Sequence, residues 1–279
     1  MNLVSTDWLE NNIKKVKIFD ATWHMPSSKR KAKKEYTDKH IKGAMFWDVD
    51  EHSDKDSPYP HMMSNSDYWT KMLGSFGIEN DDHIIVYDFS DTYSSCRLWF
   101  ALKYFGHKKV SVLDGGMKKW LNENKPTSKG ESKNVEKSGV INISDRKSEY
   151  RVNENSELIK NKRQIEESIK NFSFTLVDAR SRDRFSGKID EPRPGLKKGC
   201  IIGSKNIPFK ECIEQEKNTF KSKDELIKVF DQNNVDISKP IVFTCGSGIT
   251  ACVLGLAYSL ISGKNAVIYD GSWSEYGKK

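Results

Sequence analysis

The sequence predicts an α/β protein made of two similar halves, each with a mostly parallel sheet flanked by helices. Short apolar runs rich in Val, Ile and Phe alternate with longer segments of helical periodicity, a pattern typical of parallel sheets with helices on both faces. The same motifs also recur in the same order, 156 to 160 positions apart, in the two halves of the 279 residues. A chain of this length has room for two ordinary domains.

Four pairs of segments carry this repeat. First half before second, they are V-K-I-F-D-A (16–21) and F-T-L-V-D-A (174–179), H-I-K-G-A (40–44) and C-I-I-G-S (200–204), I-I-V-Y-D (84–88) and I-V-F-T-C (241–245), and V-S-V-L-D-G-G-M-K-K-W (110–120) and A-V-I-Y-D-G-S-W (266–273). We therefore predict a first domain at residues 1–125, a linker at 126–150 and a second domain at 151–279. Residues 122–149, which include most of this linker, are rich in Lys, Asn, Ser, Gly and Glu. Within them, residues 139–143 have the composition of a short strand.

Start and stop signals place the individual elements. A helix is predicted to begin at Ser5 or Thr6, before Trp8, because Ser and Thr side chains cap helix N-termini. Further helices are predicted at 67–76, 94–105, 157–169, 223–233 and about 250–261. The apolar run at 241–243, bounded by Pro240 and a pair of glycines, predicts a buried strand.

The composition limits the classes of partner. Hydrophobic residues make up 36% of the chain and charged residues 30%, which is typical of a globular protein with a polar surface. The net charge is +7, but acidic residues are interleaved with the basic ones, and the basic run at 27–34 lacks the aromatic residues of a nucleic-acid motif. No apolar stretch approaches the roughly 20 residues that cross a bilayer. We expect neither a nucleic-acid nor a membrane partner.

Cysteine usage indicates a reducing compartment. The five cysteines are odd in number and form no C-x-x-C pair, which argues against a disulfide framework or a zinc site. We expect no metal and no cofactor. The first residues show neither an apolar signal core nor an Arg-rich leader, so the cytosol is the expected location, with the mitochondrion as the alternative.

Cys245 is the candidate nucleophile. It ends a predicted strand, and a small-residue loop with Gly246 and Gly248 leads from it into a helix. Glycines let the loop curl so that its N–H groups, including those of Ile249 and Thr250, point inward beside the positive end of the helix dipole. We expect this cradle to hold Cys245 as its thiolate.

Two other enzyme classes use a similar loop. A phosphate-binding loop would carry Lys and Ser or Thr after its second glycine, and this chain does not. A cysteine phosphatase would need an arginine six residues after the cysteine, where Ala251 stands. Both are therefore disfavoured.

The chain resembles the tandem-domain rhodaneses of the thiosulfate sulfurtransferase superfamily, and within them the branch that uses 3-mercaptopyruvate. The motifs that carry the resemblance are C-G-S-G-I-T-A (245–251), L-D-G-G (113–116), Y-D-G-S-W (269–273), V-D-A-R-S-R-D-R-F (177–185), E-P-R-P-G (191–195), H-I-K-G-A-M-F-W-D-V-D (40–50) and S-P-Y-P-H-M (57–62). Thiosulfate-using rhodaneses typically carry basic residues directly after the cysteine, where this chain has Gly246 and Ser247.

This resemblance implies two rhodanese-like domains, of which the first is inactive because Asp88 stands where the second has Cys245. It implies sulfur transfer from 3-mercaptopyruvate through a Cys245 persulfide to a thiol acceptor such as thioredoxin, or to cyanide, with release of pyruvate. It also implies a proton relay through Ser247, His61 and Asp50, which couples a hydroxyl to a histidine oriented by a carboxylate.

The resemblance assigns Arg184 and Arg193 to substrate binding, where they would hold a carboxylate remote from the reacting sulfur. A surface ion pair with Asp190 or Glu191 is the alternative role for these arginines. For the whole protein, two alternatives stay open: a thiosulfate:cyanide sulfurtransferase, and a sulfur-carrying or regulatory module without turnover.

Overall fold

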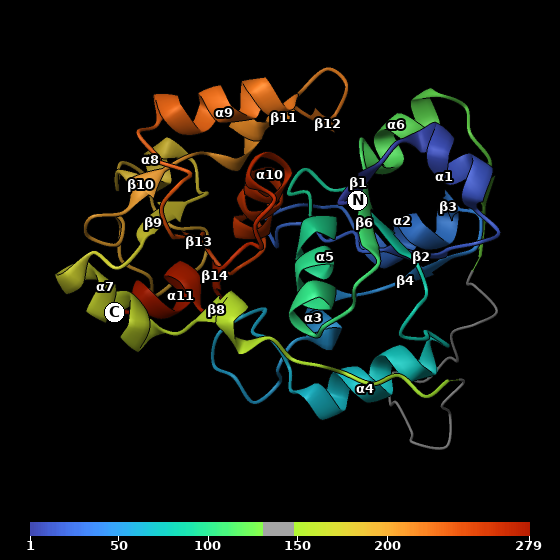
Figure 1. Ribbon diagram of the computed structural model, residues 1–279, viewed down its shortest axis with the longest axis horizontal. Coiled ribbons are helices and arrows are strands. Elements are labelled where there is room, and N and C mark those ends of the chain that lie inside the picture. The colour runs from blue at the N-terminus through green and yellow to red at the C-terminus, as the bar shows by residue number, and fades with distance from the viewer. Residues whose placement is uncertain (131–147) are drawn as a thin grey trace. The chain divides into compact units, whose positions relative to one another are not determined.

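The computed structural model describes residues 1–130 and 148–279, and these divide into two compact units. The first unit comprises Met1–His52 and Ser64–Asn155, and the second comprises Ser53–Met63 and Ser156–Lys279 (Figure 1). The segment Ser53–Met63, called the strap below, therefore groups with the second unit although its sequence lies within the first half. The strand predicted at 139–143 lies outside the described residues.

The first unit is built on a five-stranded parallel sheet in the order β1-β6-β5-β2-β4. Its elements are β1 (Leu3–Val4), α1 (Thr6–Asn12), β2 (Lys17–Asp20), α2 (Ala32–Asp38), β3 (His40–Ile41), β4 (Ala44–Phe46), α3 (Val49–His52), α4 (Ser66–Ser75), β5 (Ile84–Tyr87), α5 (Ser95–Tyr104), β6 (Val110–Leu113), α6 (Gly116–Asn122) and β7 (Thr127–Ser128). Helix α1 begins as predicted, because the Ser5 hydroxyl accepts the N–H of Trp8 at 3.1 Å.

The second unit has a five-stranded parallel sheet in the order β10-β9-β13-β14-β8. Its elements are η2 (Ser156–Leu158), β8 (Ile159–Lys160), α7 (Lys162–Asn171), β9 (Thr175–Asp178), α8 (Arg182–Phe185), β10 (Lys205–Asn206), η3 (Phe209–Cys212), β11 (Ile213–Glu214), β12 (Thr219–Phe220), α9 (Lys223–Gln232), β13 (Ile241–Thr244), α10 (Ala251–Ser262), β14 (Ile268–Tyr269) and α11 (Ser272–Tyr276). The order matches that of the first unit strand for strand, which confirms the predicted repeat.

One predicted helix begins later than expected. The helix predicted at 157–169 is preceded by the short elements η2 and β8, and α7 begins only at Lys162. Asn161 sets this start, since its side chain accepts the N–H of Gln164 while the Gln164 side chain accepts the N–H of Asn161.

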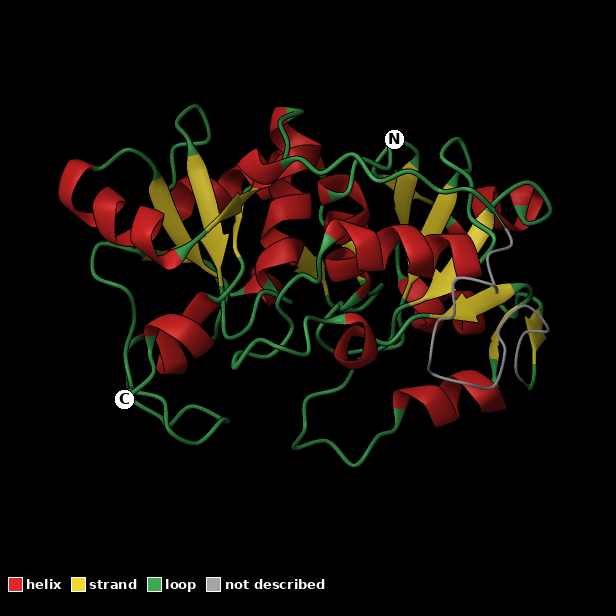
Figure 2. Cartoon of the chain, turned by 90° about the horizontal axis from the view of Figure 1, so that it is seen from below, coloured by secondary structure: helices red, strands yellow, loops and turns green. Residues whose placement is uncertain are grey.

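Helices flank the strands of each sheet (Figures 1 and 2). Successive side chains of a strand point to opposite faces of the sheet and so pack against different helices. In β13, Val242 belongs to the cluster that contains Ile165 of α7 and Trp273 of α11. Its neighbour Phe243 faces Tyr258 of α10, with ring centroids 5.6 Å apart. Each such buried side chain stabilises the fold by about 1.5–3 kcal/mol.

The parallel register brings two loops together at one edge of the second sheet. Strands β9 and β13 pair along their length, and Asp178 at the end of β9 lies opposite Thr244 at the end of β13. Because the carboxyl ends of parallel strands share an edge, the loop after β13 and helix α8 after β9 meet there.

Candidate active site

Cys245 follows β13 directly and is buried, with 2% of its surface exposed. The first residues of helix α11 hold the loop that begins at Cys245. The hydroxyl of Ser272 accepts the N–H of Cys245 at 3.2 Å and the N–H of Gly248 at 3.1 Å, and it donates to the carbonyl of Tyr269 at 2.9 Å. The N–H of Trp273 also donates to the Cys245 carbonyl at 3.0 Å. The nucleophile's backbone is therefore fixed at both its donor and its acceptor.

The loop after Cys245 carries several backbone N–H groups that point to no acceptor in residues 1–130 and 148–279. Among the residues that the structure describes, the N–H groups of Gly246, Ser247, Ile249 and Thr250 have no acceptor. Gly248, which we expected to contribute to the same cradle, instead directs its N–H to Ser272 and adopts a φ of +77°. Four unused donors beside a helix N-terminus make a site for a negative charge.

His61 reaches this loop from the strap. Its Nδ1 lies 2.9 Å from the hydroxyl of Ser247, and both side chains are buried. The strap closes on itself, since Ser53 and Met63 form a β-bridge and the N–H of Asp54 donates to the Met62 carbonyl at 2.9 Å. Two of the residues proposed for the relay therefore meet within the second unit.

Both predicted substrate-binding arginines lie against Gly246. A Cβ atom placed on Gly246 would stand 2.9 Å from Nη2 of Arg184 and 3.9 Å from Nη1 of Arg193. The absence of a side chain at this position is therefore what lets the guanidinium of Arg184 approach the loop. Arg184 comes from α8 and Arg193 from the loop after it.

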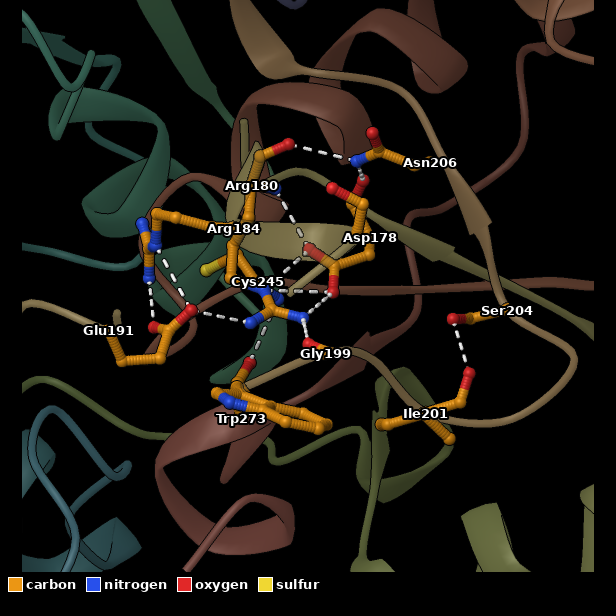
Figure 3. A network of polar contacts seen from close by, with 12 residues as sticks. Asp178, Arg180, Arg184, Glu191, Gly199, Ile201, Ser204, Asn206, Cys245 and Trp273 are labelled. Atoms are coloured by element: carbon orange, nitrogen blue, oxygen red, sulfur yellow. Dashed lines mark hydrogen bonds and ion pairs between the residues drawn. The ribbon is translucent and has the colours of Figure 1, made fainter. Parts of the chain in front are cut away.

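A buried ion-pair network holds Arg184 (Figure 3). Glu191 accepts from Nε and Nη2 of Arg184, at 3.2 and 2.6 Å, and from Nη1 of Arg180 at 2.7 Å. Arg180 also binds Asp178 at 2.7 Å and covers the ring of Trp273 at 4.5 Å. Burial opposes the charge on Arg180, but its two carboxylate partners raise its pKa above the usual value. The ion pair of Arg184 with Glu191, which was the alternative to a substrate-binding role, is thus present, but Glu191 is buried rather than at the surface.

Asp50 lies in helix α3 of the first unit. There its carboxylate accepts the indole N–H of Trp23 at 2.8 Å. Its assignment to a relay with His61 stays a prediction.

The other cysteines have surroundings that suppress reactivity. Cys96, Cys212 and Cys252 are fully buried, and the thiol of Cys252 donates to the Gly248 carbonyl at 3.1 Å. Burial raises the pKa of Cys212 to about 12 and also raises the pKa of Cys200. Among the described residues, no group of His, Cys, Asp or Glu is arranged to hold a metal.

The first unit contains the counterpart of this loop, with Asp88 in the place of Cys245. The N–H of Met117 donates to the Asp88 carbonyl at 2.9 Å, as Trp273 does to Cys245. The Asp88 carboxylate, however, accepts the N–H groups of Ser90 and Ser95, both at 2.9 Å. The loop of the first unit is therefore occupied by its own negative group.

Sequence reasoning assigned no role to Asp270 and Ser272, although it quoted the motif that contains them. Asp270 accepts the N–H of Met63 at 2.8 Å and so joins the strap to the end of β14. Comparison of the halves provides a signal for Ser272, since it stands where the first half has Gly116 and both have positive φ, +49° and +54°. A serine in a conformation that favours glycine indicates a hydroxyl with a specific contact.

Comparisons with known proteins show which family the two units resemble. A family model described as a rhodanese-like domain matches residues 5–123 and again 152–279. The chain is 39% identical to the 3-mercaptopyruvate sulfurtransferase of Mus musculus, over 98% of this chain and 91% of the mouse protein. It is 35% identical to the thiosulfate sulfurtransferase of Rattus norvegicus, over 99% of this chain and 92% of the rat protein.

Among solved structures, the chain is similar to SseA from Escherichia coli, which is described as a 3-mercaptopyruvate sulfotransferase with the rhodanese fold. The TM-score is 0.83 at 32% identity, and the match covers 98% of this chain and 99% of SseA.

Proposed function

The chain belongs to the rhodanese family, and we propose that it is a 3-mercaptopyruvate sulfurtransferase that carries sulfur as a persulfide on Cys245. One observation supports the proposal above all others. Cys245 follows a central strand and begins a loop in which four N–H groups have no acceptor among the described residues, and two arginines lie close to the glycine that follows it. One edge of the sheet thus holds three groups side by side. They are a nucleophile, a site for its charged product and a pair of arginines for an anionic substrate.

The reaction follows from these roles. The Cys245 thiolate attacks the sulfur of 3-mercaptopyruvate, a new S–S bond forms, and the electron pair of the broken C–S bond leaves with carbon as the enolate of pyruvate. A proton then converts the enolate to pyruvate. The N–H groups of Gly246, Ser247, Ile249 and Thr250 stabilise the persulfide anion through charge-assisted hydrogen bonds.

Protonation is assigned to the pair formed by His61 and Ser247. Their 2.9 Å contact allows a proton to pass between imidazole and hydroxyl. His61 takes the proton of the substrate thiol before the C–S bond breaks. It afterwards delivers this proton to the enolate carbon, so the protons balance. Asp50 is proposed to stabilise the charged imidazole.

The clamp explains the choice of donor. The carboxylate of 3-mercaptopyruvate is separated from its sulfur by two carbons, so it is best held by groups beside the loop rather than within it. Arg184, already oriented by Glu191, and Arg193 provide a fork for that carboxylate. The loop itself contributes no cation after Cys245.

Replacement of Cys245 tests the proposal directly. Cys245→Ser is expected to abolish pyruvate release from 3-mercaptopyruvate, because the serine hydroxyl cannot accept a sulfur atom as a persulfide. The measurement is steady-state pyruvate production, with Cys252→Ser, a buried thiol behind the same loop, as the matched control. Full pyruvate release by the Cys245 variant would show that the mechanism is wrong.

Thiosulfate is the second candidate donor. The rat relative named thiosulfate sulfurtransferase is almost as similar to this chain as the mouse relative, and two arginines also suit a dianion. The values of kcat/KM for the two donors, measured on one preparation with cyanide as acceptor, decide between them. A higher value with thiosulfate would overturn the preferred donor.

The natural acceptor is proposed to be a thiol, such as that of thioredoxin, because a thiolate can attack the outer sulfur of a persulfide. The cytosol is the proposed compartment. All five cysteines lie outside disulfides, which suits a reducing environment. Imaging of the tagged full-length chain distinguishes the cytosol from the mitochondrion.

A further inference from the structure

The histidine of the site belongs to a surface segment with little regular structure. The strap contributes no helix and no strand of a sheet, yet it must deliver His61 to Ser247. His61 also adopts a φ of +64°, a conformation that a non-glycine residue holds only when its surroundings impose it. Something in the second unit must therefore fix the strap.

Asp270 makes the contact that does this. Its Oδ2 accepts the N–H of Met63 at 2.8 Å, two residues beyond His61, and the Asp270 side chain is buried. Met63 is also the residue that closes the base of the strap by its bridge to Ser53. At the other end, the ammonium of Lys278 lies over the ring of Tyr59 at 5.6 Å, a partly exposed contact of lower energy.

Asp270 lies close in sequence to the residue that holds the loop of the nucleophile. Two residues later, the hydroxyl of Ser272 binds the N–H groups of Cys245 and Gly248. The turn from β14 into α11 therefore holds the nucleophile's loop through one side chain and the histidine's strap through another. A shift of this turn would move both pieces together, which keeps their separation constant.

We propose that Asp270 is a positioning residue for the sulfur-transfer reaction, which acts by holding the strap so that His61 stays against Ser247. The proposal rests on the proposed function for its kinetic test. The contact through which Asp270 holds the strap is the hydrogen bond that it accepts from the N–H of Met63. A neutral acceptor of the same shape should therefore replace it.

The kinetic test is a double-mutant cycle. Asp270→Ala is expected to lower kcat for pyruvate release about tenfold, whereas Asp270→Asn, which keeps an acceptor oxygen, stays within about twofold of the wild type. In a His61→Ala background, Asp270→Ala should cost no further activity, because the residue it positions is already gone. Asp231→Ala, an exposed acid at the end of α9, is the matched control for loss of charge.

A second readout does not depend on turnover. Lys55 is exposed in the strap, so the rate of tryptic cleavage after it reports how firmly the strap is held. This rate should rise in Asp270→Ala and stay unchanged in Asp270→Asn. If the alanine variant does not fold, Asp270→Ser, whose shorter side chain does not reach Met63, takes its place.

The outcomes separate this inference from the proposed function. An equal loss of kcat from Asp270→Ala with and without His61 would make Asp270 a general structural residue and overturn the inference. Unchanged cleavage after Lys55 in the alanine variant would overturn it as well. Absence of pyruvate release in the wild type would instead refute the proposed function, while the cleavage rates would still decide whether Asp270 holds the strap.

Discussion

Gly246 shows how one missing side chain shapes the site. Its Cα faces the guanidinium of Arg184 so closely that even a methyl group would stand 2.9 Å from Nη2. Arg184 has little room to retreat, since two of its nitrogens are held by the buried carboxylate of Glu191. The close approach of arginine and loop therefore depends on glycine at this position.

Gly246→Ala is expected to raise the KM for 3-mercaptopyruvate about tenfold and to change kcat less. The added methyl displaces the arginine that holds the substrate carboxylate, and the loss of one charge-assisted hydrogen bond amounts to about 1.5–3 kcal/mol. Steady-state kinetics of pyruvate release measure the effect. Arg184→Lys should raise the KM in the same way, whereas an unchanged KM in the glycine variant would mean that Arg184 does not hold the substrate.

Single residues of the site could be predicted where the residue type itself indicates the function, as for a nucleophile, a loop glycine or an arginine. Cys245, the glycines around it and the two arginines were all expected, and the structure brings them together at one sheet edge. Ser272 was not, because its contacts are to backbone N–H groups that become neighbours only in the folded chain. The exchange of Gly116 for Ser272 between the halves was the available clue.

Strands β2 and β9 are equivalent elements, and both end in a buried aspartate with a different partner. Asp178 at the end of β9 is paired with Arg180, while Asp20 at the end of β2 accepts from Thr22, which carries no charge. Burial raises the pKa of Asp20 to about 6, and the hydrogen bonds from Thr22 offset this only in part. The first unit therefore contains a carboxyl group whose ionisation opposes folding.

The sign of the resulting pH dependence follows from linkage. Between about pH 4 and pH 6 the folded chain binds the Asp20 proton more tightly than the unfolded chain, so stability falls as the pH rises through this window. Over about two pH units the contribution of Asp20 amounts to roughly 3 kcal/mol. Below the window both states are protonated, and above it both are ionised.

Asp20→Asn should remove this contribution. The free energy of unfolding, measured with denaturant at pH 4 and pH 7, is expected to fall less between the two values in the variant than in the wild type. Asp38→Asn, an exposed acid on α2, should behave like the wild type. A variant with the same pH dependence as the wild type would show that Asp20 ionises freely in the folded chain.

Elements were predicted well wherever their signals are local. The caps and apolar periodicity placed the start of α1, and both ends of α4, α5, α9 and α10, to within one residue. The start of α7 was misplaced because Ser156–Lys160 has helical spacing, but its backbone forms a short turn and then pairs as β8 with β14. Strand pairing depends on a distant partner, which no local pattern contains.

At the scale of the whole molecule, the two units share a strand order but differ in the group that occupies the loop. The first unit fills its cradle with the carboxyl group of Asp88, whereas the second has four loop N–H groups without an acceptor in the part of the chain that the structure describes. Duplication of the fold has therefore not duplicated the site.

The molecule should accordingly accept one sulfur atom per chain. Incubation with 3-mercaptopyruvate in the absence of an acceptor is expected to add a single sulfur, measured by intact mass and located at Cys245 by peptide mapping. Cys245→Ser should show no addition, because the pKa values of Cys200 and Cys212 are raised and the thiols of Cys96 and Cys252 have no exposed surface. A second sulfur on Cys96 or Cys200 would contradict this.

The assignment of residues to units could not be predicted from the repeat alone. Sequence similarity places His61 in the first half, and only the fold shows that its segment packs with the second. The strap lies outside every repeated motif, so no comparison of the halves draws attention to it.

The strap also decides what a fragment of the chain can do. It lies at residues 53–63, outside the second half of the sequence, yet it brings His61 to the loop that follows Cys245. Residues 151–279 expressed alone would therefore retain the thiol and lack its imidazole.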